Sequence, residues 1–155
     1  KMHYSSALVA SLALSYTALG QGLTAPCPGE GPRYGDFKCN HDQTHRVCAK
    51  LVDEGTSQPL SWGSKDFWAI TGQKQWQWDD KIVGIPNPGD SWCICMWAFA
   101  HLIDNVGCEN VHIRCEATDV DYVLANYHDG GHDLSRAHDC LRQICPQRVG
   151  LSFEM

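Results

Sequence analysis

Nine cysteines in a chain of 155 residues constrain the fold and the location of this protein more than any other feature of its sequence. Reducing compartments keep thiols free, so a chain this rich in cysteine is typical of an oxidising compartment, where disulfides persist. Because nine is an odd number, we expect up to four disulfides and one further cysteine, which is either buried or paired with a partner. The disulfide candidates, whose pairing the sequence leaves open, are Cys27, Cys39, Cys48, Cys93, Cys95, Cys108, Cys115, Cys140 and Cys145.

Residues 1–22 have the layout of an export signal or of an anchoring segment. Lys1 is followed by an apolar run from Ala7 to Leu19 and then by small residues around Gly20, where we expect cleavage. The run is too short and too rich in serine and alanine for a transmembrane helix, but it could hold the protein at a membrane if it persists. Since Lys1 precedes Met2, we expect the true N-terminus to lie upstream. The segment and the cysteines together predict an exported compartment, either secreted or an organelle lumen, and not the cytosol.

The remaining composition predicts one folded domain without a nucleic-acid partner. Hydrophobic residues make up 43% of the chain and charged residues 19%, as in a protein that folds around a core. The formal charge is −6 and the lysines and arginines are scattered, so no basic stripe is present to neutralise phosphates. We expect a single cysteine-rich domain over residues 23–146 and a flexible tail over residues 147–155.

The expected fold class is α+β, with a small, mainly antiparallel sheet packed by two or three helices and stapled by disulfides. Asp90 or Ser91 is expected to cap a helix that runs to about Asn105 and buries Cys95. Strict alternation of apolar residues over 111–117 predicts a half-buried strand.

Three shorter elements are expected in the C-terminal part of the chain. Thr118 resembles the capping residue of a short helix. Residues 128–131 predict a turn, and a last helix is expected from Asp133 to Cys145, ended by Pro146.

Cysteines and histidines gather most densely between residues 39 and 48. Two histidines four residues apart, flanked by two cysteines, carry the donor atoms that zinc prefers, and Cys93 and Cys95 could add thiolates to such a site. Disulfides compete with zinc for the same thiols, and we favour disulfides, so no cofactor is expected and zinc is the alternative. The metal candidates are Cys39, His41, His45 and Cys48.

Thiol redox chemistry is a further alternative for Cys93 and Cys95. Redox proteins commonly place Cys-x-x-Cys at a helix start, and Cys93-Ile94-Cys95 is one residue shorter. A disulfide within Cys-x-Cys closes a small strained ring, so we expect each of these two cysteines to pair elsewhere. No Gly-x-Ser-x-Gly motif is present for nucleophilic hydrolysis.

Two blocks of the sequence resemble a known family. They read His45-Arg46-Val47-Cys48-Ala49 and Pro88-Gly89-Asp90-Ser91-Trp92-Cys93-Ile94-Cys95, and Glu116-Ala117-Thr118 follows them. These motifs resemble the uncharacterised domain-of-unknown-function family 2237, which occurs in bacteria, plants and algae. Asp119 stands where that family usually has histidine, so no role of that histidine is carried over.

The resemblance implies a division among the cysteines but no activity, because the family has no agreed one. Its own set corresponds to Cys27, Cys39, Cys48, Cys93 and Cys95, while Cys108, Cys115, Cys140 and Cys145 are additions in this chain. A tryptophan-rich stretch over residues 68–78 replaces the acidic middle of the family pattern. The family's range in algae implies the thylakoid lumen as one candidate for the exported compartment.

We find no convergent catalytic set, and therefore expect a non-enzymatic structural or interaction protein. It would be an accessory subunit of a larger membrane-associated complex, such as a photosynthetic one, with membrane association through residues 1–22. A thiol- or zinc-dependent activity at the two cysteine clusters is the first alternative, and a secreted binder of a small ligand is the second. The candidates for a protein interface or a ligand cleft are Trp62, Trp68, Trp76 and Trp78.

Overall fold

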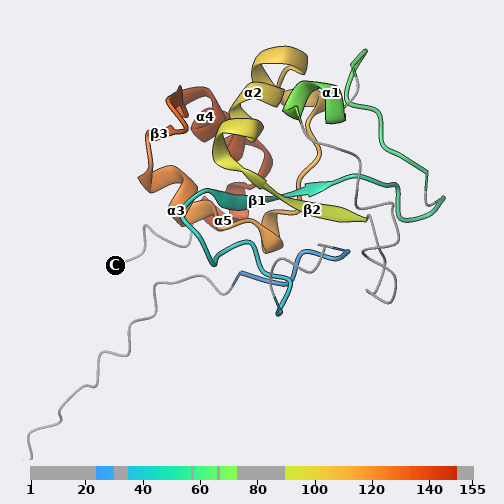
Figure 1. Cartoon of the computed structure of the whole chain (residues 1–155), viewed down its shortest axis with the longest axis horizontal. Helices are drawn as coiled ribbons and strands as arrows, with labels where there is room; N and C mark the ends of the chain where they lie inside the picture. Colours follow the sequence, from blue (N-terminus) through green and yellow to red (C-terminus); the bar gives the residue numbers. More distant parts are fainter. Residues whose placement is uncertain (1–23, 30–34, 57, 66, 73–89, 150–155) are drawn as a thin grey trace, which may run out of the picture.

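The computed structural model describes residues 24–29, 35–56, 58–65, 67–72 and 90–149 (Figure 1). The predicted export segment at residues 1–22, residues 150–155 of the predicted tail, and the two candidates Trp76 and Trp78 lie outside the described residues.

The fold is α+β, as the sequence predicts, and its sheets are antiparallel pairs of strands. One antiparallel pair is central, and we call it a hairpin although a helix separates its two strands in the chain; the other is a short C-terminal hairpin. Four disulfides staple the chain. In chain order the elements are β1 (His45–Lys50), α1 (Phe67–Thr71), β2 (Ser91–Cys95), α2 (Met96–Val106), the 3-10 helices η3 (Cys108–Asn110) and η4 (Cys115–Ala117), α3 (Val120–Ala125), β3 (His128–Asp129), β4 (His132–Asp133), α4 (Ser135–Ile144) and α5 (Pro146–Val149).

The β1–β2 hairpin divides the interior into two cores. Residues directly opposite in an antiparallel pair share a face, and successive residues alternate between the faces. Val47 lies opposite Ile94 and Ala49 opposite Trp92, and these four side chains belong to the main apolar core. Cys48 lies opposite Cys93 on the other face, where a second and smaller core forms. All five residues of β2 are buried, because both faces of this strand are covered.

The main core lies between the hairpin and the helices. Helix α2 buries Phe99, Leu102 and Ile103, and α4 contributes Ala137 and Leu141. These apolar side chains recur at helical spacing, so each helix presents one face to the hairpin side of the molecule. In Figure 1 the helices α1, α2 and α4 lie together on one side of the hairpin.

The expected helix start at Asp90 or Ser91 is wrong, because residues 91–95 form β2 and α2 begins at Met96. Pairing with β1 determines the conformation here, and this tertiary contact is not visible in local periodicity. Cys95 is buried as expected, but as the capping residue before α2 and not within the helix.

The expected strand over residues 111–117 is reduced to a single bridge between Ile113 and Ala49, followed by η4. The segment still pairs with the free edge of β1, since Lys50 N donates to His112 O at 2.9 Å and Arg114 N to Cys48 O at 2.9 Å. The apolar alternation therefore correctly indicated an extended segment beside β1, but this segment forms a single bridge and then turns into η4.

The C-terminal elements differ from the expected ones mainly at their ends. Asp119 caps α3 in place of Thr118, with its side chain accepting from Tyr122 N at 3.4 Å. The predicted turn is confirmed as the loop of the β3–β4 hairpin, where Gly130 and Gly131 both have positive φ, as tight hairpin turns require. Pro146 begins helix α5 at the position where the sequence predicted the end of order, because proline fits the first position of a helix.

Candidate functional site

Two disulfides fill the second face of the β1–β2 hairpin. Cys27 is bonded to Cys48 of β1 with an S–S distance of 2.01 Å, and Cys39 is bonded to Cys93 of β2 at 1.99 Å. All four cysteines have an exposed fraction of 0%, and Ala117 completes this core. We call these four residues the sulfur cluster.

The two disulfides lie beside each other, and three of their four sulfur atoms are close together. The Sγ atoms of Cys27, Cys39 and Cys93 all lie within 4.8 Å of one another. The fourth, Cys48 Sγ, is covalently bound to Cys27 Sγ. Elements far apart in the sequence thus bring four sulfur donors to one buried place.

Residues 24–29 and 35–40, which we call the strap, carry Cys27 and Cys39 across the hairpin. In Figure 1 the strap lies on the side of the hairpin opposite α1 and α2. Ala25 N donates to Glu116 O at 2.8 Å, and Cys27 N donates to Phe37 O at 2.8 Å. Among the described residues Phe37 is the one non-glycine residue with φ in the left-handed region, at 61°. This uncommon conformation costs about 1 kcal/mol, so the strap has to be held by its contacts.

Thr118 connects the strap to β1 beneath the sulfur cluster. The residue is fully buried, its hydroxyl donates to Arg114 O at 2.8 Å, and the same oxygen accepts from Cys48 N at 3.1 Å. A parallel bridge joins Cys39 to Thr118. The buried hydroxyl therefore satisfies one backbone donor and one backbone acceptor next to the sulfurs.

The predicted zinc set is dispersed in this structure, because its two cysteines belong to different disulfides. His41 Nε2 contacts Asp36 Oδ1, and this hydrogen bond lowers the pKa of the Asp36 carboxyl below its ordinary value. His45 Nδ1 lies 2.7 Å from Asp42 Oδ2. With the thiols bonded to one another and both histidines beside carboxylates, Cys39, His41, His45 and Cys48 do not converge on one point.

Cys95 carries the one cysteine sulfur outside the four disulfides, and it is buried. It precedes α2, whose first amides are already engaged: Met96 N donates to Thr44 O at 2.9 Å and Trp97 N to Asp129 Oδ2 at 3.0 Å. A helix N-terminus favours a thiolate, but here a carboxylate already occupies that end. Since Cys93 is bonded to Cys39, the Cys93-x-Cys95 pair is not a dithiol in this state.

The remaining two disulfides staple the C-terminal side of the molecule. The Cys108–Cys140 disulfide joins η3 to α4, and the Cys115–Cys145 disulfide joins η4 to the end of α4. Cys140 and Cys145 belong to the main core, while Cys108 and Cys115 are partly exposed at its edge.

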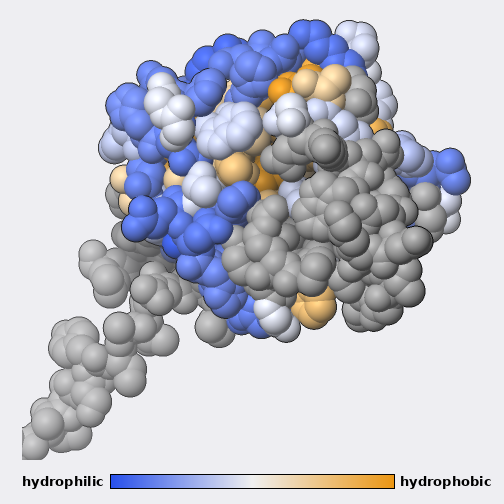
Figure 2. Space-filling model, in the orientation of Figure 1, coloured by the Kyte–Doolittle hydropathy of each residue, from blue (hydrophilic) through white to orange (hydrophobic). Residues whose placement is uncertain are grey.

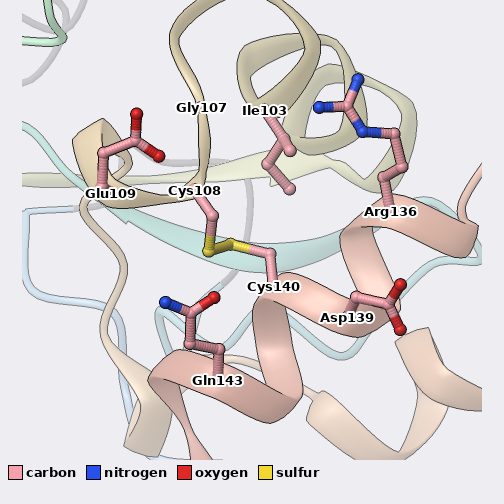
Figure 3. Close-up of a pocket in the computed structure, with 8 residues that line it drawn as sticks. All are labelled: Ile103, Gly107, Cys108, Glu109, Arg136, Asp139, Cys140 and Gln143. Atoms are coloured by element: carbon pink, nitrogen blue, oxygen red, sulfur yellow. A yellow bond between two sulfur atoms is a disulfide. The ribbon is translucent and has the colours of Figure 1, made fainter.

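A surface depression of about 310 Å³ lies beside the Cys108–Cys140 disulfide (Figure 3). Its lining includes side chains of both charges, namely Glu109, Arg136 and Asp139. Both cysteines that line it are bonded to each other, so neither offers a nucleophilic thiol. The depression thus contains no nucleophile activated by a base.

The two described tryptophan candidates are not equivalent. Trp62 is 3% exposed and packs against Phe67, with a ring-centroid distance of 4.9 Å, and against His112 at 5.2 Å. It is a core residue and not an exposed interface residue. Trp68 is half-buried and meets Phe67 edge-on at 4.8 Å.

Sequence reasoning assigned Cys27 and Cys93 to disulfides but did not place them together with Cys39 and Cys48. It grouped donors that are neighbours in the sequence, whereas the cluster forms across sequence separations of 21 and 54 residues. The signal that pointed toward it was the family resemblance, which named these four cysteines together with Cys95.

A scan against protein-family models finds no match, and searches of curated proteins and of solved structures find none either. The resemblance described above therefore rests on its motifs alone. Within the described residues, no helix has the length and apolarity to cross a membrane. The four disulfides indicate an oxidising, extracytosolic compartment.

Proposed function

We propose that this protein is a non-enzymatic structural or interaction protein of an extracytosolic compartment, acting as an accessory subunit of a larger assembly. One observation carries the proposal. The side chains that the sequence offered for chemistry are used in structural contacts: eight of the nine cysteines form disulfides, and His41 and His45 contact carboxylates. Cysteines bonded in this way are typical of a stapled scaffold.

Aromatic and histidine side chains near the β3–β4 hairpin support a role in protein contact. The Trp97 ring stacks on His132 with centroids 5.8 Å apart, and His101 lies 6.1 Å from the same His132 ring. Among the described residues, Tyr127 is the one large hydrophobic residue that is exposed, with an exposed fraction of 64%. Hydrophilic residues cover much of the described surface in Figure 2. Exposed aromatic side chains are enriched where proteins meet, so we propose this region as the contact surface.

For the finer location, the export-like segment is consistent with secretion or with an organelle lumen, and the range of the resembling family favours a lumen such as the thylakoid lumen. A photosynthetic complex would then be the assembly.

The test is native separation of material from the natural source, followed by detection of the chain. We expect it to migrate with an assembly far larger than its own 17.3 kDa. A variant with Trp97→Ala and Tyr127→Ala should migrate as a free chain, while Lys65→Ala, an exposed residue elsewhere, should not change migration. Migration of the unaltered protein as a 17.3 kDa chain would contradict the proposal.

A thiol-dependent activity at Cys95 is the second candidate, and the strand register favours it. His45 lies opposite Cys95 in the β1–β2 pair, and Asp42 is placed to orient the His45 ring. Nucleophile, base and orienting group follow this order in cysteine hydrolases. If this candidate is correct, His45→Ala will slow alkylation of Cys95 in the folded protein several-fold. An unchanged rate would rule out activation by His45.

A further inference from the structure

We infer that the sulfur cluster is a zinc site in its reduced form, in which Cys27, Cys39, Cys48 and Cys93 supply all four ligands. This inference does not depend on the proposed function. It also differs from the zinc set predicted from the sequence, because it contains no histidine. The oxidised chain holds two disulfides in the same place, so the site exists only after both have been reduced.

The positions of the sulfur atoms carry the inference. Structural zinc takes four thiolates in a tetrahedron with Zn–S distances of about 2.3 Å, which places the sulfurs about 3.8 Å apart. In the oxidised cluster the bonded sulfurs lie 2.01 Å and 1.99 Å apart, and the Sγ atoms of Cys27, Cys39 and Cys93 lie within 4.8 Å of one another. Conversion to the tetrahedron requires the four sulfurs, Cys48 Sγ among them, to shift by rotation about their Cα–Cβ bonds.

The backbone around the cluster is held by contacts other than the disulfides. Cys48 and Cys93 lie on paired strands whose opposite face packs in the main core. The strap is held by the hydrogen bond from Ala25 N to Glu116 O and by the bridge between Cys39 and Thr118. The Cα atoms of the two bonded pairs lie 5.8 Å and 5.3 Å apart. The ligands therefore stay near one another after reduction.

Burial specifies the kind of site. All four cysteines have an exposed fraction of 0%, so no position on the metal is open to substrate or water. A closed site of four thiolates is structural and not catalytic. Among the described residues, the sulfurs of Cys27, Cys39 and Cys93 form the one group of three or more cysteine, histidine or carboxylate ligand atoms close enough to bind one ion, and Cys48, bonded to Cys27, would supply the fourth ligand.

The conversion balances with a dithiol as the reductant. Each disulfide accepts two electrons and two protons from one dithiol, which leaves as a cyclic disulfide. The four resulting thiols then bind one Zn²⁺ and release four protons, because zinc binds thiolates. Exchange with two molecules of such a cyclic disulfide, each of which accepts two electrons and two protons and becomes the dithiol, reverses the sequence and expels the ion. Zinc and the two disulfides are thus alternative ways of fastening the strap to the hairpin.

The experiment uses the full chain, reduced without oxygen by a water-soluble phosphine that becomes the phosphine oxide, and titrated with cobalt(II) as a probe for zinc. We expect saturation at one equivalent, with the visible and near-ultraviolet absorption of tetrahedral cobalt bound to four thiolates, and loss of this absorption on addition of zinc. The oxidised chain should give no such absorption.

Three variants separate this site from the other thiols and from the histidines. Cys39→Ala with Cys93→Ala should abolish the four-thiolate spectrum. Cys108→Ala with Cys140→Ala, which removes two thiols outside the cluster, should keep it, and so should His41→Ala with His45→Ala. The inference is overturned if the reduced wild-type chain gives no such spectrum, whether or not circular dichroism shows it folded. It is also overturned if the first variant keeps the spectrum, or if either of the other two loses it.

Discussion

The two pairs of disulfides in this protein differ in what surrounds them. In the N-terminal pair, all four cysteines are fully buried and their sulfurs form a single cluster beneath the strap. In the C-terminal pair, each disulfide joins a partly exposed cysteine of a 3-10 helix to a buried cysteine in or next to α4. The first pair forms a small core of its own, whereas the second is attached to a core that already exists.

This difference shows that the same covalent bond has two structural roles in one chain. On the strap side the disulfides replace apolar packing, since the second core consists of four cysteines and Ala117. On the helical side the main core contains large side chains such as Phe99, Leu102 and Leu141. We therefore expect the strap side to depend more strongly on its cysteines than the helical side does.

Removal of the Cys39–Cys93 disulfide should have the largest effect. Cys39→Ala with Cys93→Ala opens a loop of 54 residues and leaves a void in the second core. We expect the free energy of unfolding to fall by about 5 kcal/mol, of which about 4 kcal/mol is loop entropy. Urea unfolding of the oxidised proteins measures this loss.

The matched variant on the helical side is Cys108→Ala with Cys140→Ala, which opens a loop of 32 residues. Here we expect a loss of about 4 kcal/mol, because the loop is shorter and Cys108 is already partly exposed. A larger loss in this variant than in the strap-side variant would reverse the comparison.

The next comparison is between two ion pairs, a largely buried one next to Thr118 on the strap side and an exposed one on α4. Asp119→Ala removes both the cap of α3 and the pair with Arg46, whose guanidinium lies 2.7 Å from Asp119 and 3.7 Å from the centre of the Tyr122 ring. Both partners are largely buried, with exposed side-chain fractions of 12% for Arg46 and 20% for Asp119. We expect a loss of about 2 kcal/mol in thermal or urea unfolding.

Asp139→Ala is the control on the helical side. Asp139 pairs with Arg142 on α4 at 3.2 Å, but its side chain is 82% exposed. Exposed pairs contribute little, so we expect a loss below about 0.5 kcal/mol. Equal effects of the two substitutions would mean that burial does not set the strength of these pairs.

How far the sequence predicts this molecule depends on whether a feature is local. The α+β class, the abundance of disulfides and the glycine turn before β4 follow from composition and from short patterns. The strand at Ser91–Cys95 was missed because it exists through pairing with β1, about 45 residues away in the chain. Local signals described α2 well but extended it backwards over the strand.

The candidate site was harder to predict than the fold. Cysteines and histidines between residues 39 and 48 suggested one compact ligand set, but Cys48 is bonded to Cys27 and Cys39 to Cys93. The path of the strap and the register of the hairpin determine which cysteines lie close enough to bond. Neither can be derived from the spacing of cysteines alone.

Glycine substitutions compare backbone requirements in the two regions. Gly131 in the β3–β4 turn has φ of 83°, and a Cβ built there would meet no atom within 4 Å. Gly131→Ala should therefore cost about 1 kcal/mol through backbone strain alone. Gly35→Ala in the strap also meets nothing and has no positive φ, so we expect no loss, or a gain of up to about 0.5 kcal/mol. Thermal unfolding measures both effects. A loss of stability in Gly35→Ala would contradict the expectation that the strap accepts a Cβ at this position.

The smallest expected effect is in the pH dependence of stability. Burial raises the pKa of Asp90, next to β2, against the opposing effect of Arg114. The folded state then binds this proton more tightly than the unfolded state, so stability falls as pH rises from the ordinary aspartate pKa through the raised value. Asp90→Asn should remove that fall when unfolding is followed between pH 3 and pH 7, a range of about four units around the ordinary pKa.

Asp133 before α4 should behave in the opposite way. Hydrogen bonds from Ser135 lower the pKa of Asp133, so its contribution is present above the ordinary aspartate pKa and is lost as pH falls through the lowered value. Asp133→Asn should therefore reduce the loss of stability on acidification. Identical pH profiles for the two variants would contradict the assignment of burial to one carboxyl and hydrogen bonding to the other.

The most direct test of this account is the disulfide map of the protein purified from its source, alkylated under denaturing, non-reducing conditions. Cleavage after basic residues and at Asp104 separates Cys95 from Cys108, and fragmentation between residues 93 and 95 resolves that pair. The account predicts Cys27 linked to Cys48, Cys39 to Cys93, Cys108 to Cys140 and Cys115 to Cys145, with alkylation at Cys95. A link between Cys27 and Cys39 or between Cys48 and Cys93, or alkylation of any cluster cysteine, would contradict it.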